Sequence, residues 1–464
     1  MNPVTTSAPT HPGTPTRQSR ALAFGLCTAV VAVAFEVISV ATAMPAAARE
    51  LDGLSLYAWA FSLFAIGQLF ATVAAGRLCD RIGPARPMAG GLALFTVGIV
   101  VAATAPTMIQ LISGRLLQGL GSGLTSIAMY VVIARAFDES YRPTMFSWIS
   151  AAWVLPSFIG PVVAAFLTHH FGWRWVFWSV LPLVAIGALL MLPLLFRIAD
   201  GPVERDGAVA VPPAPLWAAG LAAVGAAAIQ LAGQRPGVFT VLGGFVGVVA
   251  VGVALPRLMP PRFFRFGPGL PPVIVVRFLM AGAFFGTEAF VPLMLVEQRG
   301  LALLLAGSAL TIGSLGWTVG SWLQSRRFVP LRREQLISLG AASVAVGVAV
   351  VAMVAYLEWW VWVVGVAWII AGFGMGIATA STSIAMMTLS AEVDQGRNSS
   401  SLQFGEAFGG GLFIGLGGTL FAALHPSGNL ALTFGTVIAA MAFVGLLGAL
   451  ASLRTGPIRT HSAG

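Results

Sequence analysis

The sequence predicts an all-α protein that crosses a membrane many times, and two observations carry this prediction. Of the 464 residues, 58% are hydrophobic and only 9% are charged, whereas a soluble domain carries about 25% charged residues. So few charges cannot cover a water-facing surface. The apolar segments are also continuous over about 18–25 residues, the length that a membrane-spanning helix needs. The strands of a membrane β-barrel would instead alternate over about ten residues.

Hydropathy divides the chain into about 14 spans. They are expected near residues 21–44, 54–76, 87–105, 108–134, 145–167, 174–196, 216–233, 237–256, 271–296, 301–324, 336–357, 359–387, 402–424 and 430–452. The segment before the first span, residues 1–19, is rich in Pro, Thr and Ser. We expect it to be a disordered cytoplasmic tail.

The basic residues are all arginines, 25 in number, and they give a formal net charge of +9. They are dispersed over short loops, so we expect no nucleic-acid partner. Counted in alternate loops, arginines are far more numerous on one side of the membrane, and this holds along the chain only if the number of spans is even. The arginine-rich side is expected to be cytoplasmic, which places both termini in the cytoplasm and the protein in the cell membrane. The other side contains only Arg49, Arg174, Arg235 and Arg299.

An internal repeat indicates two similar halves. The glycine-rich segment 119–123 in the fourth span matches the segment 372–376 in the twelfth, 253 residues later. The loop that begins at Gly76 matches the one that begins at Gly320. Transporters are commonly built from such repeats, with the substrate site between them. We therefore expect an N-terminal six-helix bundle at 20–200, a linker with two extra transmembrane helices at 201–265, a C-terminal six-helix bundle at 266–453 and a cytoplasmic tail at 454–464.

The loop after the second span carries an ordered motif, Gly76-Arg-Leu-Cys-Asp80-Arg81-Ile-Gly83-Pro-Ala-Arg86. It resembles the signature loop of the major facilitator superfamily. The resemblance implies a cytoplasmic gate built from Gly76, Asp80, Arg81 and Gly83, in which Gly76 allows helices to approach closely. The alternative is a plain turn whose arginines only set the topology.

Charged residues inside apolar spans are costly and usually functional. In the fourth span, Arg115-Leu-Leu-Gln118-Gly119 resembles the family motif that is associated with proton coupling. In the first span, Glu36 stands in a segment similar to one in the fourteen-span drug:proton antiporters, where the acid is usually aspartate. A carboxyl group in mid-membrane resists ionisation unless it is paired. We expect Arg115 to be the partner and Glu36 to be the main proton carrier.

The fifth span contains Gly160-Pro161, which resembles the glycine–proline motif that marks antiporters. Pro156 replaces an expected glycine, and Ala164-Ala165 replace a glycine pair. The small residues still permit close packing, so the motif favours an antiporter. The alternative is a proline kink without any directional meaning.

Two further acids lie inside spans. Glu288 in the ninth span is 252 residues from Glu36, within the range of the repeat, and Glu406 lies in the thirteenth span. Glu288 is expected to take part in proton coupling, and both acids are expected in a substrate cavity. A structural ion pair is the alternative for each. Arg277 is about three helical turns from Glu288, and we expect it to reach the cytoplasmic interface.

Trp153 and Met129 are expected to line the same cavity, although lipid contact is the commoner role of tryptophan in membrane proteins. The sequence has no phosphate-binding Gly-Lys-Ser/Thr loop, so ATP is not expected to drive the protein. No arrangement of histidine, cysteine or acidic residues suggests a metal site or a hydrolase. We therefore expect no cofactor, no metal and no enzymatic activity.

These resemblances together imply a major facilitator fold, two six-helix bundles plus two extra helices, that works by alternating access. The fourteen-span members mostly expel lipophilic or cationic compounds in exchange for protons. The implied partners are a small-molecule substrate, protons and the lipid bilayer. The alternatives are an importer, an exporter of a lipid or native metabolite, and a non-transporting membrane scaffold or receptor. The buried charges of Glu36, Arg115 and Glu288 speak against the scaffold.

Overall fold

The computed structural model describes residues 17–138, 141–198, 215–233, 238–260, 263–324, 331–390 and 395–458. Most of the predicted tail at 1–19 and much of the predicted linker lie outside these ranges, as do Arg205, Arg235, Arg262, Arg326, Arg327 and Arg459. Within them all regular structure is helical, and 14 segments are long and apolar enough to cross a membrane. The predicted fold class and the predicted number of spans are therefore confirmed.

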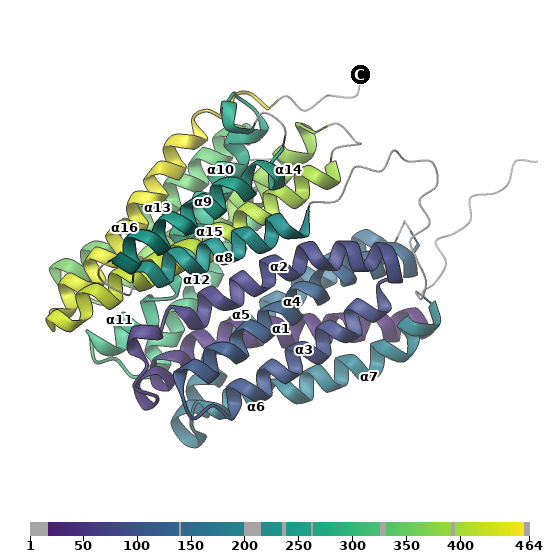
Figure 1. The fold of residues 1–464 in the computed structure, drawn as a ribbon, viewed down its shortest axis with the longest axis horizontal. Helices are drawn as coiled ribbons and strands as arrows, with labels where there is room; N and C mark the ends of the chain where they lie inside the picture. Colours follow the sequence, from purple (N-terminus) through teal and green to yellow (C-terminus); the bar gives the residue numbers. More distant parts are fainter. Residues whose placement is uncertain are drawn as a thin grey trace, which may run out of the picture.

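Two sets of helices form two halves of the molecule (Figure 1). The N half comprises α1 (Arg17–Glu50), the short η1 (Leu54–Leu56), α2 (Trp59–Ile82), α3 (Ala85–Ala103), α4 (Met108–Ala136), α5 (Arg142–Phe171), α6 (Arg174–Trp178) and α7 (Val180–Ile198). The C half comprises α10 (Leu270–Glu288), α11 (Val291–Glu297), α12 (Leu303–Gln324), α13 (Arg333–Leu357), α14 (Val363–Thr388), α15 (Gln395–Leu424) and α16 (Leu430–Ser452). The extra helices α8 (Leu216–Gly233) and α9 (Val238–Leu258) lie between them in sequence.

The observed helices extend beyond the predicted spans where polar turns continue the helix. Helix α1 runs on to Glu50, and α15 begins at Gln395 rather than at residue 402. Hydropathy detects only the apolar core of such a helix, and helix ends are the least certain part of any sequence-based assignment. The predicted ninth span is broken into α10 and α11, and the sixth into α6 and α7.

Both halves use the same internal packing. Helix α4 packs on α2 and α3, and α14 packs on α12 and α13. A Cβ atom at Gly119 of α4 would collide with the backbone carbonyl of Phe64 in α2, and one at Gly372 of α14 with the backbone carbonyl of Gly313 in α12. The glycines therefore bring helix backbones into close contact. The internal repeat of the sequence is thus a repeat of helix packing.

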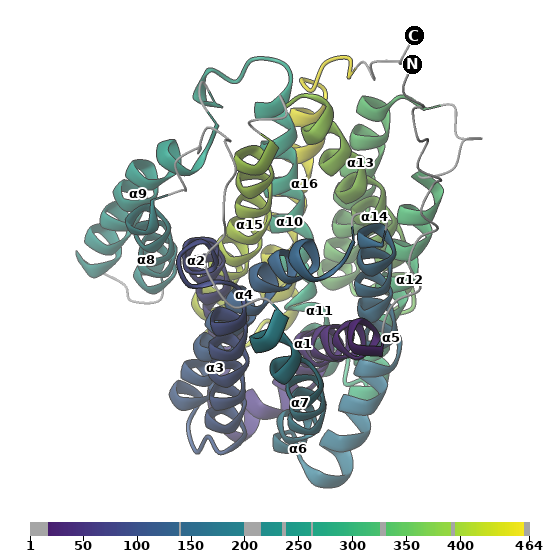
Figure 2. The same cartoon turned by 90° about the vertical axis from the view of Figure 1, so that its right-hand side faces the viewer.

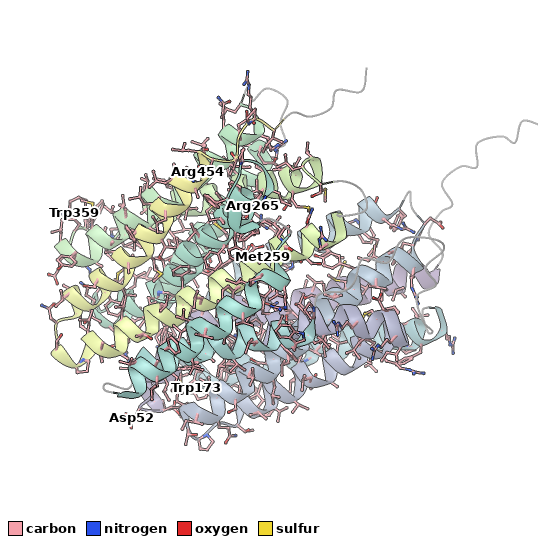
Figure 3. All side chains as sticks on the ribbon, turned by 45° about the horizontal axis from the view of Figure 1, so that its top comes forward. Asp52, Trp173, Met259, Arg265, Trp359 and Arg454 are labelled. Atoms are coloured by element: carbon pink, nitrogen blue, oxygen red, sulfur yellow. The ribbon has the colours of Figure 1, made fainter. Side chains whose placement is uncertain are left out.

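The two halves touch near the arginine-poor end of the spans. Arg49 at the end of α1 forms an ion pair with Glu297 at the end of α11, and Thr42 of α1 packs against Gly307 of α12. The larger contact surfaces between the halves are formed by α2 with α15 and by α5 with α12. In Figure 3, Asp52 and Trp359 mark the arginine-poor end of the N half and of the C half.

The extra helix α8 lies against both α2 and α15, with α9 packed on it (Figure 2). Gln230 of α8 is buried between the halves. Its Oε1 accepts a hydrogen bond of 2.7 Å from the hydroxyl of Ser62 in α2, and its backbone carbonyl accepts one of 3.2 Å from Thr419 in α15. Helix α8 therefore connects the two halves along one of the seams between them.

Candidate functional site

The two charged residues predicted to pair, Glu36 of α1 and Arg115 of α4, form an ion pair in the interior of the N half. Their side chains are 0% and 2% exposed. A buried pair is retained only with good geometry and further hydrogen bonds, because both charges lose their hydration. The structure thus brings together the residues that the sequence selected, while their role in proton transfer stays a prediction.

Further contacts fix the guanidinium of Arg115. Its Nε donates to the backbone carbonyl of Ala60 in α2 at 2.9 Å, and its NH1 donates to Oε1 of Gln118 at 2.5 Å. Its Cζ lies 4.4 Å from the centre of the Phe64 ring. Oε2 of Glu36 and Nε2 of Gln118 have no hydrogen-bond partner among the described residues. The free oxygen of Glu36 is therefore an atom that can accept a proton without displacing Arg115.

At the equivalent place the C half is apolar. Trp368 of α14 stands 253 residues after Arg115, is fully buried, and stacks on Phe284 of α10 with ring centres 4.8 Å apart. Phe284 is therefore the residue of α10 that the buried ring of Trp368 meets. The expected role of Glu288 in proton coupling stays a prediction.

Glu288 is the last residue of α10. Pro292 stands four residues later and has no N–H to donate to the carbonyl of Glu288, which explains why the helix breaks here. The Glu288 side chain is half-buried. Among the described residues it forms no hydrogen bond and no ion pair. Its carboxyl group is thus not committed to an internal partner.

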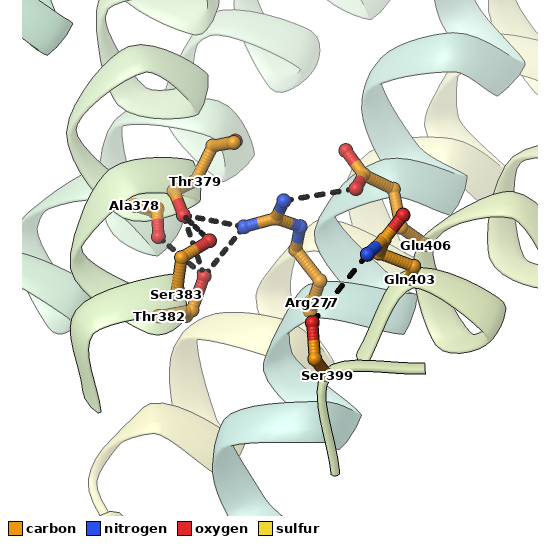
Figure 4. A network of polar contacts seen from close by, with 8 residues as sticks. All are labelled: Arg277, Ala378, Thr379, Thr382, Ser383, Ser399, Gln403 and Glu406. Carbon is orange, nitrogen blue, oxygen red and sulfur yellow. Dashed lines mark hydrogen bonds and ion pairs between the residues drawn. The ribbon is translucent and has the colours of Figure 1, made fainter. Parts of the chain in front are cut away.

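Arg277 and Glu406 form a second ion pair, in the C half (Figure 4). NH2 of Arg277 lies 2.9 Å from Oε2 of Glu406, and NH1 donates to the backbone carbonyl of Thr379 at 2.5 Å and to the hydroxyl of Thr382 at 2.6 Å. Arg277 is buried, and its expected reach to the cytoplasmic interface stays a prediction. The Glu406 side chain is 23% exposed, so this pair is less enclosed than that of the N half.

The signature loop forms the end of α2 and the turn into α3. Gly83 ends α2 with φ of +77°, a conformation that glycine adopts without strain. Asp80 is half-buried and Arg81 exposed, and both Asp80 and Arg135 of α4 act electrostatically on the thiol of Cys79. A Cβ atom at Gly76 would have no neighbour within 4 Å. The expected close helix approach at Gly76 is therefore absent from this conformation.

The Gly160-Pro161 segment of α5 contacts α1 and α12 at once. The hydroxyl of Ser39 in α1 donates to the backbone carbonyl of Gly160 at 3.2 Å. Pro161 Cβ lies 3.4 Å from the position that a Cβ atom at Gly307 of α12 would take. This motif therefore belongs to a contact between the halves. Of the two other predicted cavity residues, Trp153 is exposed and Met129 is buried, and their contact with a substrate stays a prediction.

Sequence reasoning missed Tyr57, which bonds across the halves, and Ser62 and Gln230, which join the N half to α8. The hydroxyl of Tyr57 donates to the backbone carbonyl of Ala289 at 2.7 Å. None of these residues stands in a motif, and none is charged, so the sequence carries no signal for them. No group of three or more His, Cys, Asp or Glu residues in the described part of the chain is placed to hold a metal ion.

The sequence is similar to a protein-family profile and to several known proteins. The sequence profile described as Major Facilitator Superfamily matches residues 24–414. The chain is 27% identical to a probable multidrug-efflux transporter of Mycobacterium tuberculosis, over 74% of this chain and 75% of that protein. It is 31% identical to the methylenomycin A resistance protein of Streptomyces coelicolor, over 68% of this chain and 66% of that protein.

Solved structures resemble the whole chain. An auto-inhibited peptide transporter of the POT family aligns with a TM-score of 0.70 at 15% sequence identity, covering 95% of this chain and 99% of that one. A POT family transporter in complex with 5-aminolevulinic acid aligns with a TM-score of 0.70 at 12% identity, covering 96% and 97%. At these identities the likeness concerns the fold alone.

Proposed function

Since the chain belongs to the major facilitator superfamily, a family of membrane transporters, we propose that it is a proton-coupled antiporter that exports lipophilic or cationic small molecules. The observation that carries this proposal is the enclosed ion pair of Glu36 and Arg115, in which one carboxylate oxygen has no partner among the described residues. A protein that only supported other proteins in the membrane would gain nothing from so costly a pair.

The pair supplies the chemistry that proton exchange needs. A proton on Oε2 neutralises Glu36, weakens its attraction to Arg115 and lets α1 move relative to α4. Loss of the proton restores the ion pair. An inward proton gains about 2.3 kcal/mol for each 100 mV of membrane potential. This energy shifts an equilibrium between two conformations by more than tenfold, which is enough to drive a substrate outward.

The acids in the C half support the cationic part of the proposed substrate class. Glu288 has no polar partner among the described residues, and the Glu406 side chain is 23% exposed. Carboxylates attract ammonium groups of substrates in a space of low dielectric constant. The names of the relatives, multidrug efflux and methylenomycin A resistance, agree with export of such compounds.

The conformation also fits an exporter that is ready to load. The halves touch near the arginine-poor end, which we take as the outer end on the basis of the arginine distribution. In the opposite conformation the signature loop would close the inner end, with Asp80 as part of a latch rather than of the substrate site. We expect Asp80→Asn to slow transport while leaving substrate binding nearly unchanged.

The test is proton-driven uptake of a fluorescent lipophilic cation into inverted vesicles that carry the protein. The chain should accumulate the dye only when a proton gradient is imposed. Glu36→Gln keeps the size and a hydrogen-bonding group, and we expect it to abolish the response to the gradient. Glu288→Gln should be milder if Glu288 mainly attracts the cation. Full coupling in Glu36→Gln with loss of coupling in Glu288→Gln would reverse the two assignments, and uptake only in right-side-out vesicles would indicate an importer.

A further inference from the structure

One hydrogen bond between the halves lies next to an acid that the proposed function uses. Tyr57, at the junction of η1 and α2, is fully buried. Its hydroxyl donates to the backbone carbonyl of Ala289 at 2.7 Å. Its ring also packs against Phe290, with ring centres 5.8 Å apart. Tyr57 thus holds the main chain of the C half at the residue that follows Glu288.

The main chain is irregular at this point. Helix α10 ends at Glu288 and α11 begins at Val291, because Pro292 cannot donate a hydrogen bond to the carbonyl of Glu288. The break is closed by tight turns, in which the amide of Phe290 donates to the carbonyl of Thr287 at 2.9 Å. A helix with a missing bond bends more easily than a continuous one. The direction of the Glu288 side chain therefore depends on what holds Ala289.

In alternating access the two halves must separate at the end where they now touch, so the bond from Tyr57 to Ala289 must break. We propose that Tyr57 is a positioning residue for Glu288. It fixes the α10–α11 break, and with it the orientation of the Glu288 carboxyl group, while the arginine-poor end is closed. When that end opens, the bond breaks, and the α10–α11 break and the Glu288 carboxyl group are no longer fixed. This inference rests on the proposed function, since it gives Glu288 a state that changes with the transport cycle.

The ion pair of Arg49 with Glu297 offers a matched control. It also joins the two halves at the arginine-poor end, but Glu297 lies at the far end of α11 from the break. The Arg49 side chain is 48% exposed, so solvent weakens the pair. Arg49→Gln therefore loosens the contact between the halves and keeps the hydroxyl of Tyr57, on which Glu297 acts only electrostatically. Tyr57→Phe keeps the aromatic packing and removes the hydroxyl at the break.

The first measurement is amide hydrogen exchange of the full chain in lipid nanodiscs. Loss of one buried hydrogen bond shifts a local equilibrium by about fivefold. We expect Tyr57→Phe to speed exchange in peptides that cover residues 286–297 by about this factor, and Arg49→Gln to leave residues 286–291 unchanged. Equal acceleration in both variants would show that Tyr57 acts only on the contact between the halves, and would overturn the inference.

The second measurement links the break to Glu288. Binding of tetraphenylphosphonium is measured as a function of pH for Tyr57→Phe, Glu288→Gln and the double variant. We expect Tyr57→Phe to change the pH profile and to weaken binding about fivefold, and to have no further effect in the Glu288→Gln chain. The same change in both backgrounds would mean that Tyr57 does not act through Glu288. That result would leave the proposed function intact, because gradient-driven export and its loss in Glu36→Gln do not depend on Tyr57.

Discussion

Where α4 crosses α2, the N half buries an arginine, and where α14 crosses α12, the C half buries a tryptophan. Arg115 pairs with Glu36 of α1, while Trp368 stacks on Phe284 of α10. The glycines that bring the helices together are the same in both halves. The two halves therefore share the same backbone packing. At the matching position, one half has a charged side chain and the other has an aromatic one.

The two ion pairs differ in how far they are enclosed by the protein. The N half encloses its ion pair almost completely and so accepts the large desolvation cost of two ions. The C half places its own pair, Arg277 with Glu406, where one partner stays partly exposed. Protonation of an enclosed carboxylate changes its electrostatic attraction to a neighbouring arginine far more than protonation of an exposed carboxylate does. Under the proposed function, the enclosed pair of the N half responds to protons and the partly exposed pair of the C half meets the charged substrate.

The largest expected effect follows from breaking the enclosed pair. Arg115→Leu leaves the carboxylate of Glu36 without a counter-charge, and removal of one partner of a buried pair costs about 3–5 kcal/mol. We expect a strong loss of thermal stability in detergent, followed by circular dichroism, and no gradient-driven uptake. The double variant Arg115→Leu/Glu36→Leu should recover stability but not transport. If the single variant proves as stable as the unchanged chain, the pair contributes nothing to folding.

A second effect tests the aromatic counterpart. Trp368→Ala removes a fully buried ring from the C half and should destabilise the protein by about 3 kcal/mol through the cavity that it leaves. Uptake by the folded fraction should still depend on the proton gradient. Trp362→Ala is the control, because Trp362 is exposed, and it should change stability very little. Loss of gradient dependence in Trp368→Ala would mean that coupling is shared between the halves.

A smaller effect is expected at the pair of the C half. Glu406→Gln keeps a hydrogen-bonding group beside Arg277, and Arg277 retains its bonds to Thr379 and Thr382. We expect a loss of about 1 kcal/mol in unfolding free energy and clearly weaker binding of tetraphenylphosphonium, measured by equilibrium dialysis. A loss as large as that of Arg115→Leu would show that the two pairs do not differ in enclosure.

The smallest effect concerns the helix that belongs to neither half. Gln230 accepts a hydrogen bond from Ser62, but its buried Nε2 has no partner among the described residues. Replacing both groups by apolar ones can be nearly neutral. We expect Gln230→Met with Ser62→Ala to change the unfolding free energy by less than about 1 kcal/mol, while Ser62→Ala alone costs more. A large loss in the double variant would make α8 an essential part of the contact between the halves.

Much of the fold could be predicted from the sequence, since continuous apolar segments and alternating arginines define helices and their number. The pair of Glu36 and Arg115 could also be predicted, because two unlike charges in adjacent apolar spans have few other partners. The pair of Arg277 and Glu406 was not predicted. These residues are separated by 129 positions, no motif links them, and only the packing of α10 on α15 brings them together.

The contacts between the halves lay beyond sequence reasoning for a different reason. The hydroxyl of Tyr57 donates to a backbone carbonyl. Because every residue has such a carbonyl, the residue type at the acceptor position carries no signal. At Gly76, a Cβ atom would have no neighbour within 4 Å in this conformation. A glycine can pack against another helix in one conformation of a transporter and not in another, and the sequence does not distinguish the two.

The position of α8 makes the two sides of the molecule unlike. One seam between the halves, formed by α2 and α15, is covered by α8 with α9 behind it, whereas the other seam is formed by α5 and α12 (Figure 2). A lipophilic compound dissolved in the bilayer meets a third helix at the first seam and only the two paired helices at the second. The two flanks that face the bilayer are therefore unlike, and the two-fold repeat of the halves becomes one-sided in the plane of the membrane.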